Sequence, residues 1–444
     1  MKYVNFLCVL LLTLVGQANA ELKVNITQGT IDPVPIAITE FSSEGGGLFS
    51  DVDSSQIASD LPKIVMSDLQ SSGLFRPLDP RSFIQNSLDP IRFSDWRLIQ
   101  SQALVTGTVK DMGGGKVRVE FRLYDVVTER QMEGLAFNGT AKEWRRIAHK
   151  VADAIYQRIT GEKGYFDTRI VYVARKGEGK TVKTRLAIMD YDGENHKYLT
   201  NGHHLTLTPR FSPSAQELVY LDYGKDNKTP RVHTMNASTK KQRRLGSFNE
   251  MTFAPRYLDA NNILLSRAES GNSSIFLIDT RNRRIQRLTR GPWIDTSPSA
   301  SPDGGRIVFN SDRGGSQQLY VMNRDGSGVQ RISGGGGRYA TPVWSPRGDY
   351  IAFTKMYRGQ FYIGIMHPDG TGERLLAKGY LVEEPTWSPN GRVIIFTRQG
   401  YPQRGRKTLD TKLFMVDVTG YNERPVKTPG GENAISAAWS PLIP

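Results

Sequence analysis

The chain has 444 residues, a single cysteine and a formal net charge of +14. Because one hydrophobic core stops growing at roughly 250 to 300 residues, this length favours two domains. One cysteine excludes an intramolecular disulfide and a thiolate cluster for a structural metal. Lysine and arginine are spread along the chain instead of gathering with aromatic residues, which argues against nucleic-acid binding.

The first twenty residues have the pattern of a secretory signal peptide. Lys2 precedes an apolar run from Phe6 to Val15, and Ala18-Asn19-Ala20 supplies the small residues of a cleavage site. We therefore expect residues 1–20 to be removed on export, together with Cys8, and the mature protein to begin at Glu21. No other run approaches about 18 apolar residues, so we expect no membrane insertion.

Residues 21–165 do not repeat, and their pattern predicts a mixed α/β domain. Apolar and polar residues alternate in 21–27, as in a strand with one apolar face. The remaining elements predicted in chain order are a buried strand over 36–38, a helix over 54–71 that Pro62 kinks or shortens, strands over 103–110, 116–125 and 135–138, and a final helix over 142–160. Gly161 and Gly164 mark the end of this domain.

Residues 166–444 contain one repeat written six times. Its first part is a Pro-x-aromatic-Ser-Pro segment such as Pro342-Val343-Trp344-Ser345-Pro346, recurring at spacings of 43 to 52 residues. A short aliphatic strand, an alternating strand with an Asp-Gly type turn and a short outer strand follow in each copy. Four strands per repeat of this length predict the blades of a propeller. The expected fold is an α/β N-terminal domain followed by a six-bladed β-propeller.

The order of the repeat also predicts how the ring closes. The chain begins the array with the aliphatic run Ile170-Val171-Tyr172 and ends it with the first segment of a repeat, Trp439-Ser440-Pro441. The two ends therefore complete one blade together, which removes the exposed edge that an open array would leave.

Catalytic signatures are missing from the sequence. It has no Gly-x-Ser-x-Gly motif, and the nearest phosphate-loop mimic, Gly177 to Thr181, has Ala174 in place of the first glycine. We predict no catalytic residue, no cofactor and no metal site. Two alternatives stay open: a propeller hydrolase or lyase, and a binder of sugars or peptidoglycan that uses Tyr339 and Tyr380. For a binding protein, the six loops that precede the Pro-x-aromatic segments would form the recognition surface at one mouth of the propeller.

The whole arrangement resembles the TolB family of the Tol-Pal envelope system. The resemblance rests on the export signal, the α/β domain, the six repeats and the boundary motif Tyr165-Phe166-Asp167-Thr168-Arg169-Ile170-Val171-Tyr172-Val173. It implies a monomeric, non-catalytic periplasmic protein within a larger envelope complex. Its implied partners are the peptidoglycan-associated lipoprotein Pal and the inner-membrane protein TolA, and its implied task is outer-membrane integrity and constriction during cell division.

The resemblance also implies where these partners bind. TolA binding maps to residues 21–33, with Glu21, Leu22, Val24 and Ile26 as contacts. Pal binding maps to the mouth loops, with the contacts Thr208, Met251, Thr252, Thr296, Arg338, Thr341 and Glu383. Thr296 matches the family's Thr-x-Pro position, and we expect Thr208 and Thr341 to occupy the same place in their repeats. Met251-Thr252-Phe253 departs from the family, which has a histidine and an asparagine there.

Overall fold

The computed structural model describes residue 22 and residues 32–45, 53–85, 89–177, 181–214, 216–224, 230–247, 250–401 and 410–443. The predicted signal peptide and, apart from residue 22, the strand predicted over 21–27 lie outside these described residues. Within the described part of the chain, no helix combines the length and the apolar character needed to cross a bilayer.

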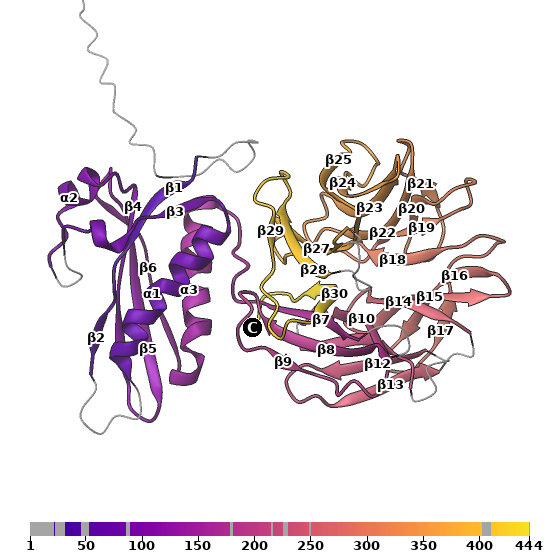
Figure 1. The fold of residues 1–444 in the computed structure, drawn as a ribbon, viewed down its shortest axis with the longest axis horizontal. Coiled ribbons are helices and arrows are strands. Elements are labelled where there is room, and N and C mark those ends of the chain that lie inside the picture. Colours follow the sequence, from indigo (N-terminus) through magenta and orange to yellow (C-terminus); the bar gives the residue numbers. More distant parts are fainter. Residues whose placement is uncertain are drawn as a thin grey trace, which may run out of the picture.

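The N-terminal region is a mixed sheet with two long helices on one face. The strand order is β3-β1-β4-β5-β6, and β2 pairs with β4. The elements are β1 (Val34–Ile38), β2 (Ser42–Glu44), α1 (Ser54–Ser71), β3 (Phe75–Pro77), η1 (Pro80–Ser82), α2 (Phe93–Leu98), β4 (Ala103–Asp111), β5 (Lys116–Asp125), β6 (Arg130–Thr140), η2 (Ala141–Glu143) and α3 (Trp144–Thr160). Figure 1 shows α1 and α3 on the side of this sheet that is turned toward the propeller.

Strict alternation along β5 explains the one-sided packing. Val117, Val119, Phe121 and Leu123 are buried against the helices, whereas the residues between them face outward. A strand places successive side chains on opposite faces, so this pattern leaves the second face of the sheet polar. The sheet therefore has a face packed on α1 and α3 and a solvated open face.

Pro62 lies inside α1 without ending it. A proline has no backbone N–H, so it leaves the carbonyl of Ala58, four residues earlier, without its helical partner. The backbone N–H of Phe41 donates to that carbonyl at 3.2 Å. The connection after β1 thus satisfies the group that the proline leaves free, and the full helix predicted over 54–71 is confirmed.

The propeller consists, within the described residues, of six four-stranded antiparallel sheets. Five blades are continuous in sequence: β10 (Thr206–Phe211), β11 (Glu217–Asp222), β12 (Arg231–Asn236) and β13 (Gln242–Ser247); β14 (Thr252–Tyr257), β15 (Asn262–Glu269), β16 (Asn272–Asp279) and β17 (Ile285–Arg287); β18 (Thr296–Ala300), β19 (Arg306–Ser311), β20 (Gln318–Asn323) and β21 (Gln330–Arg331); β22 (Arg338–Trp344), β23 (Ile351–Tyr357), β24 (Gln360–Met366) and β25 (Arg374–Gly379); β26 (Leu381–Trp387), β27 (Val393–Gln399), β28 (Thr411–Asp417) and β29 (Arg424–Pro425).

The sixth blade joins the two ends of the propeller. Its strands are β30 (Asn433–Trp439), β7 (Arg169–Lys176), β8 (Lys183–Asp190) and β9 (Lys197–Tyr198), and Ile435 is paired with Val173. The predicted six-bladed fold and its closure are therefore confirmed. Among the described residues, β30 covers the edge of β7 that the start of the array would otherwise leave unpaired.

An aromatic cluster joins the N-terminal region to the propeller. Tyr165 and Phe166 are fully buried, and the ring of Tyr165 lies edge-on against Trp439 with centroids 5.6 Å apart. Tyr191, from the turn after β8, stacks on Trp439 at 6.2 Å. These rings belong to one hydrophobic core that also contains residues of α1 and α3. The boundary motif seen in the sequence is thus the shared core of the two parts.

The sequence missed the short elements of the N-terminal region. β2, β3 and α2 span only three to six residues each, too few for a periodic pattern to show. β6 is longer than predicted, because the exposed residues on either side of 135–138 also pair with β5.

Candidate functional site at the open mouth of the propeller

The first strand of every blade lines the central channel. Neighbouring first strands contact one another around the ring: β10 touches β30 and β14, and β22 touches β18 and β26. All six run in the same direction, so the loops that precede them lie together at one mouth, with the loops between second and third strands. The turns after the first strands and those between third and fourth strands lie at the opposite mouth.

The N-terminal region packs at that opposite mouth. Asn390, in the turn after β26, donates to the carbonyl of Lys163 at 2.8 Å, and Asn422, in the turn before β29, donates to the carbonyl of Ser71 at 2.8 Å. Arg347, in the turn after β22, pairs with Glu162 at 2.7 Å. The mouth with the preceding loops is therefore the one that the described N-terminal residues leave uncovered. We call it the open mouth.

Each first strand is interrupted by a bulge near the open mouth. The register with the second strand shifts once in every blade, for example between Leu207 and Arg210 and between Glu383 and Thr386. One residue per bulge is left-handed, with φ between +46° and +56°: these residues are Thr208, Ala254, Ser297, Thr341, Glu384 and Ser436. None is glycine, so each costs on the order of 1–2 kcal/mol. Such strained positions and bulges concentrate at functional sites.

The bulges correct one expected equivalence. Thr208, Ser297 and Thr341 each directly precede the proline and carry the positive φ, whereas Thr296 lies one residue earlier. The position of Thr296 corresponds to Leu207 and Ala340, the last residues in register before the shift. The prediction that Thr208 and Thr341 occupy the place of Thr296 was therefore wrong by one residue. When the repeats are aligned on their prolines, Thr208 and Thr341 match Ser297, whereas Thr296 lies before the bulge.

Charged groups lie on the first strands within the channel. The Arg210 guanidinium is buried and donates to the carbonyl of Pro209 at 2.7 Å. Burial lowers the pKa of Arg210 and of Arg256, and the carboxylate of Glu384 opposes both shifts. Burial, reinforced by the charge of Glu384, raises the pKa of Glu383 to about 7. The adjacent carboxyl groups of Glu384 and Glu383 thus differ in role. Glu384 offsets the positive charge of the buried guanidinium groups, whereas Glu383 binds its proton more tightly than an ordinary glutamate does.

The predicted contact residues differ in exposure. Met251 is 49 % exposed and Arg338 is exposed, so both can reach a partner. Thr252 is completely buried, and so is Tyr339. Thr252 is predicted to contact Pal and Tyr339 to line a sugar site, but the structure places both side chains in the blade packing and not at the surface, since successive residues of a strand alternate between the two.

Threonine hydroxyls at the bulges are used differently. The hydroxyl of Thr341 bonds to that of Thr354 at 2.8 Å, and Thr296 donates to the side chain of Asn310 at 3.4 Å. The buried hydroxyl of Thr208 has no hydrogen-bond partner among the described residues. Replacing the hydroxyl of Thr208 therefore breaks no hydrogen bond among the described residues, unlike replacing that of Thr296 or Thr341.

Exposed apolar side chains surround the open mouth. Besides Met251, they are Ile294 (41 %), Tyr380 (41 %) and Tyr401 (68 %), and the rings of the two tyrosines lie 5.5 Å apart. Ile294 and Tyr401 were missed by the sequence reasoning. Each is a single apolar residue in a polar loop, a weak signal that only the fold brings into one region.

The predicted N-terminal contacts are described only at Leu22. Its backbone N–H donates to Asp125 at 3.3 Å, and its side chain packs against the core of the N-terminal region. Glu21, Val24 and Ile26 lie outside the described residues. The structure thus places one residue of the predicted segment against the end of β5.

One trio among the described residues has the composition of a metal site, namely His149, Asp190 and Asp192, whose ligand atoms lie within 4.8 Å of one another. Arg145 pairs with Asp192, and Asn195 donates to Asp190 at 2.5 Å. Burial lowers the pKa of His149, but Asp68, 2.6 Å away, raises it more, and the resulting pKa is about 9. Arg145 pairs with Asp192, Asn195 with Asp190 and the imidazole with Asp68, so we interpret the trio as part of an ion-pair network between α3 and the propeller.

Comparisons with known proteins agree on one family. A family described as the TolB beta propeller domain matches residues 156–443, and one described as the TolB amino-terminal domain matches residues 22–132. The chain is 51% identical over 239 residues to the Tol-Pal system protein TolB of Paramagnetospirillum magneticum. That match covers 53% of this chain and 52% of the relative, so the chain spans about half the length of the curated relative it matches.

Solved structures support the same conclusion. The crystal structure of TolB from Acinetobacter baumannii has a TM-score of 0.78 at 27% identity and covers 95% of this chain and 100% of its own. Hydrazine synthase of Kuenenia stuttgartiensis has a TM-score of 0.52 at 15% identity, covering 62% of this chain and 46% of its own. The second likeness concerns the fold alone, and it shows that this architecture also occurs in an enzyme.

Proposed function

Because the chain belongs to the TolB family of the Tol-Pal system, we propose that it is a non-catalytic periplasmic scaffold that binds Pal at the open mouth of its propeller and TolA through residues 21–33. In this role it supports outer-membrane integrity and constriction during cell division. Export through a cleavable signal peptide at residues 1–20 belongs to the same proposal, as does the domain division at about residue 165.

The observation that carries the proposal is the construction of the open mouth. Exposed Met251, Ile294 and Tyr380 surround a channel whose six first strands are all bulged at that end. Large apolar side chains next to polar loops are the usual anchors of a protein interface, since they bury most area per side chain. The exposed guanidinium group of Arg338 adds a donor for an acidic partner.

A scaffold is also favoured by how the channel uses its charges. Arg210 bonds to backbone carbonyls, and Glu384 compensates the buried guanidinium groups. A hydrolase or lyase would need a nucleophile and a base within hydrogen-bond reach of each other and of a substrate. Arg210 is instead bonded to the backbone carbonyls of Pro209 and Ser436.

TolA binding by residues 21–33 would follow strand addition. Alternating side chains in Glu21, Leu22, Val24 and Ile26 suit a strand that joins a partner's sheet, where backbone bonds supply affinity and every second side chain selects the partner. The hydrogen bond between Leu22 and Asp125 would have to break before this segment could join the sheet of TolA, so the bond opposes TolA binding.

A second candidate function is supported by the tyrosine pair at the open mouth. Tyr380 and Tyr401 are exposed neighbours and could stack on a sugar ring of peptidoglycan. Sedimentation of the purified protein with cell-wall sacculi, with and without soluble Pal, separates direct attachment from attachment through Pal.

The proposal is tested by titrating soluble Pal into two matched variants. Met251→Asp places a charge in the open mouth, and we expect Pal affinity to fall at least tenfold. Leu375→Asp introduces the same charge at a residue with 43 % exposure on β25, the outer strand of its blade, and should leave Pal affinity unchanged. Equal affinities for the two variants would remove the open mouth as the Pal site.

A further inference from the structure

The outer strand of the N-terminal sheet has an open edge. Among the described residues, β6 pairs with β5 on one side only, and α3 is the other element packed on it. Long edge strands are usually protected by charged residues or proline, because their free backbone groups accept another strand. The segment Gly134-Leu135-Ala136-Phe137-Asn138-Gly139 contains neither. This stretch of β6 therefore lacks the usual protection against strand addition.

The free backbone groups of this edge can be identified from the register. The N–H of Ala141 donates to the carbonyl of Gly115, which places residues 139, 137 and 135 in the hydrogen-bonded pairs with β5. The intervening residues 134, 136, 138 and 140 turn their backbone groups outward. Thr140 confirms this, since its N–H donates to Glu143 at 3.1 Å. Ala136 and Asn138 remain as the pair of outward residues in the middle of the strand.

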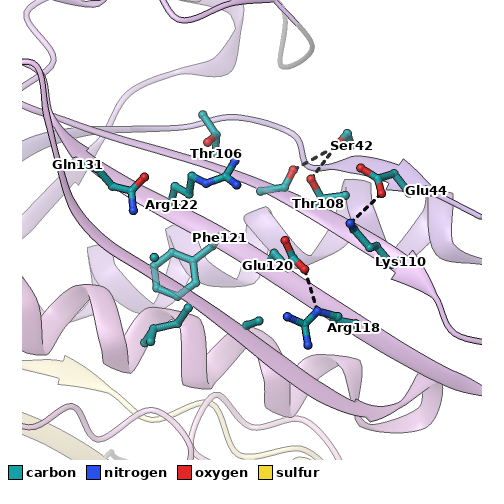
Figure 2. Close-up of a pocket in the computed structure, with 14 residues that line it drawn as sticks. Ser42, Glu44, Thr106, Thr108, Lys110, Arg118, Glu120, Phe121, Arg122 and Gln131 are labelled. Carbon is teal, nitrogen blue, oxygen red and sulfur yellow. Dashed lines mark hydrogen bonds and ion pairs between the residues drawn. The ribbon is translucent and has the colours of Figure 1, made fainter.

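The same outward residues carry their side chains on the open face, where the sheet is hollowed. Arg122 is paired across the strands with Gly134, and Glu120 with Ala136. Because glycine and alanine have little or no side chain, a cavity of about 420 Å³ lies over this part of β5 and β6 (Figure 2). A side chain from a strand added beside β6 could therefore reach across it to β5.

Among the basic side chains that line the cavity, Arg122 is the one without an ion pair to a described residue, and its nearest negative charge, on Glu120, is already paired with Arg118. Lys110 pairs with Glu44 at 3.0 Å, and Arg118 pairs with Glu120 at 2.7 Å. Arg122 is exposed, and Figure 2 shows no hydrogen bond or ion pair from its guanidinium to the residues drawn around it. An acidic side chain is the natural complement of a free guanidinium group, which can bind a carboxylate through two N–H donors.

The other face of the edge is apolar. Leu135 is 42 % exposed and Phe137 is half-buried, and both lie on the face that packs on the helices. A strand added to β6 would thus find an apolar surface on one face and a basic cavity on the other.

We propose that the edge of β6 is a binding site for an extended peptide segment of a partner protein whose residues alternate between acidic and apolar. The partner residue opposite Ala136 exchanges two backbone hydrogen bonds with it, and because cross-strand pairs share a face, its acidic side chain turns to the cavity. Adjacent strands are about 4.8 Å apart, so that side chain and Arg122 meet over Gly134 and Ala136. The neighbouring apolar residues of the peptide pack on Leu135 and Phe137. The site lies on the N-terminal region and is therefore separate from the open mouth of the propeller.

The test uses the full mature chain and a synthetic peptide, acetyl-Ser-Val-Glu-Val-Glu-Leu-Asp-Ser-amide, with a control peptide that has lysine at the three acidic positions. We expect the acidic peptide to bind at least tenfold more tightly than the lysine peptide. Arg122→Glu should reverse this preference. Because Arg122 is exposed, the variant should retain its fold, which circular dichroism verifies. Backbone hydrogen exchange should slow at Ala136 and Asn138 when the acidic peptide is bound.

A second variant tests the edge itself. Ala136→Pro removes one outward N–H donor without breaking a bond to β5, so it should abolish peptide binding and leave Pal binding at the open mouth unchanged. The proposal is overturned if the acidic peptide fails to bind, if Arg122→Glu binds both peptides as the unchanged protein does, or if hydrogen exchange at Ala136 and Asn138 is unaffected.

Discussion

Trp439 donates its indole N–H to the hydroxyl of Thr168 at 2.8 Å, across 271 residues of sequence. The bond joins the last strand of the propeller to the segment that leaves the N-terminal region. Thr168 in turn donates to the carbonyl of Tyr165 at 2.6 Å. Closure of the ring and attachment of the N-terminal region therefore use the same few residues.

Removing residues 433–444 should open the ring. The deletion takes away β30, exposes the edge of β7 and removes the ring of Trp439 from the shared core. We expect loss of cooperative unfolding and aggregation, because a buried strand edge becomes available for pairing. Thermal unfolding followed by circular dichroism checks this. Deletion of residues 442–444 alone keeps β30 and should leave a cooperative transition, whereas a cooperative transition in both deletions would contradict the role assigned to β30.

Thr208→Gly should stabilise the protein. Thr208 has a φ of +48°, which glycine adopts without a steric penalty, and its hydroxyl has no bond to lose among the described residues. We expect a gain of about 0.5–1 kcal/mol in the free energy of unfolding, measured with urea. Thr341→Gly relieves the same strain but loses the bond to Thr354, so its net effect should be near zero. A gain for Thr341→Gly larger than that for Thr208→Gly would be inconsistent with this explanation.

Glu383→Gln should change how stability depends on pH. The pKa of Glu383 rises from an ordinary value of 4.5 to about 7 in the folded protein, so the folded state binds its proton more tightly than the unfolded chain does. The favourable contribution of Glu383 to the free energy of unfolding is complete below pH 4.5 and is lost as the pH rises through 7. Urea unfolding should therefore show the variant gaining stability relative to the unchanged protein between pH 5 and pH 8.

Glu384→Gln is the matched control for that experiment. Glu384 compensates the buried guanidinium groups of Arg210 and Arg256, so its neutral replacement should lower stability at pH 8. If both variants shift stability in the same direction at pH 8, the two adjacent carboxyl groups do not have the separate roles described above.

The propeller could be predicted from the sequence because each blade repeats its own pattern. A segment such as Pro385-Thr386-Trp387 identifies a first strand, and its recurrence at Trp439 predicts that the last strand completes the blade begun at Ile170. Because the same pattern occurs six times, an ambiguous strand in one blade can be assigned from the equivalent strands of the other blades.

The mouth could be predicted only in outline. The sequence places Met251 and Thr252 side by side in one loop, but the strand alternation that exposes the first and buries the second depends on where β14 begins. The offset of Thr296 from Thr208 depends on the bulge, which appears only when two strands are paired. Register and exposure depend on how two strands pair, so they cannot be read from the sequence of one strand alone.

The joint between the two parts was the least predictable feature. The pairing of His149 with Asp68 joins α1 to α3, and Asn422 reaches α1 from a propeller turn 351 residues away. No periodicity connects residues so far apart. The boundary motif around Tyr165 was recognised by resemblance, and only the fold shows that its rings are the core that both parts share.

Calorimetric titration with Pal and with TolA shows whether the protein is a scaffold with two separate binding sites. The mature protein and a form lacking residues 21–33 would each be titrated with soluble Pal and with the C-terminal domain of TolA. We expect the shortened form to lose TolA binding and still bind Pal, and we expect Met251→Asp to show the opposite pattern. Failure of the intact protein to bind either partner, or loss of both interactions on removing residues 21–33, would contradict a scaffold with two separate sites.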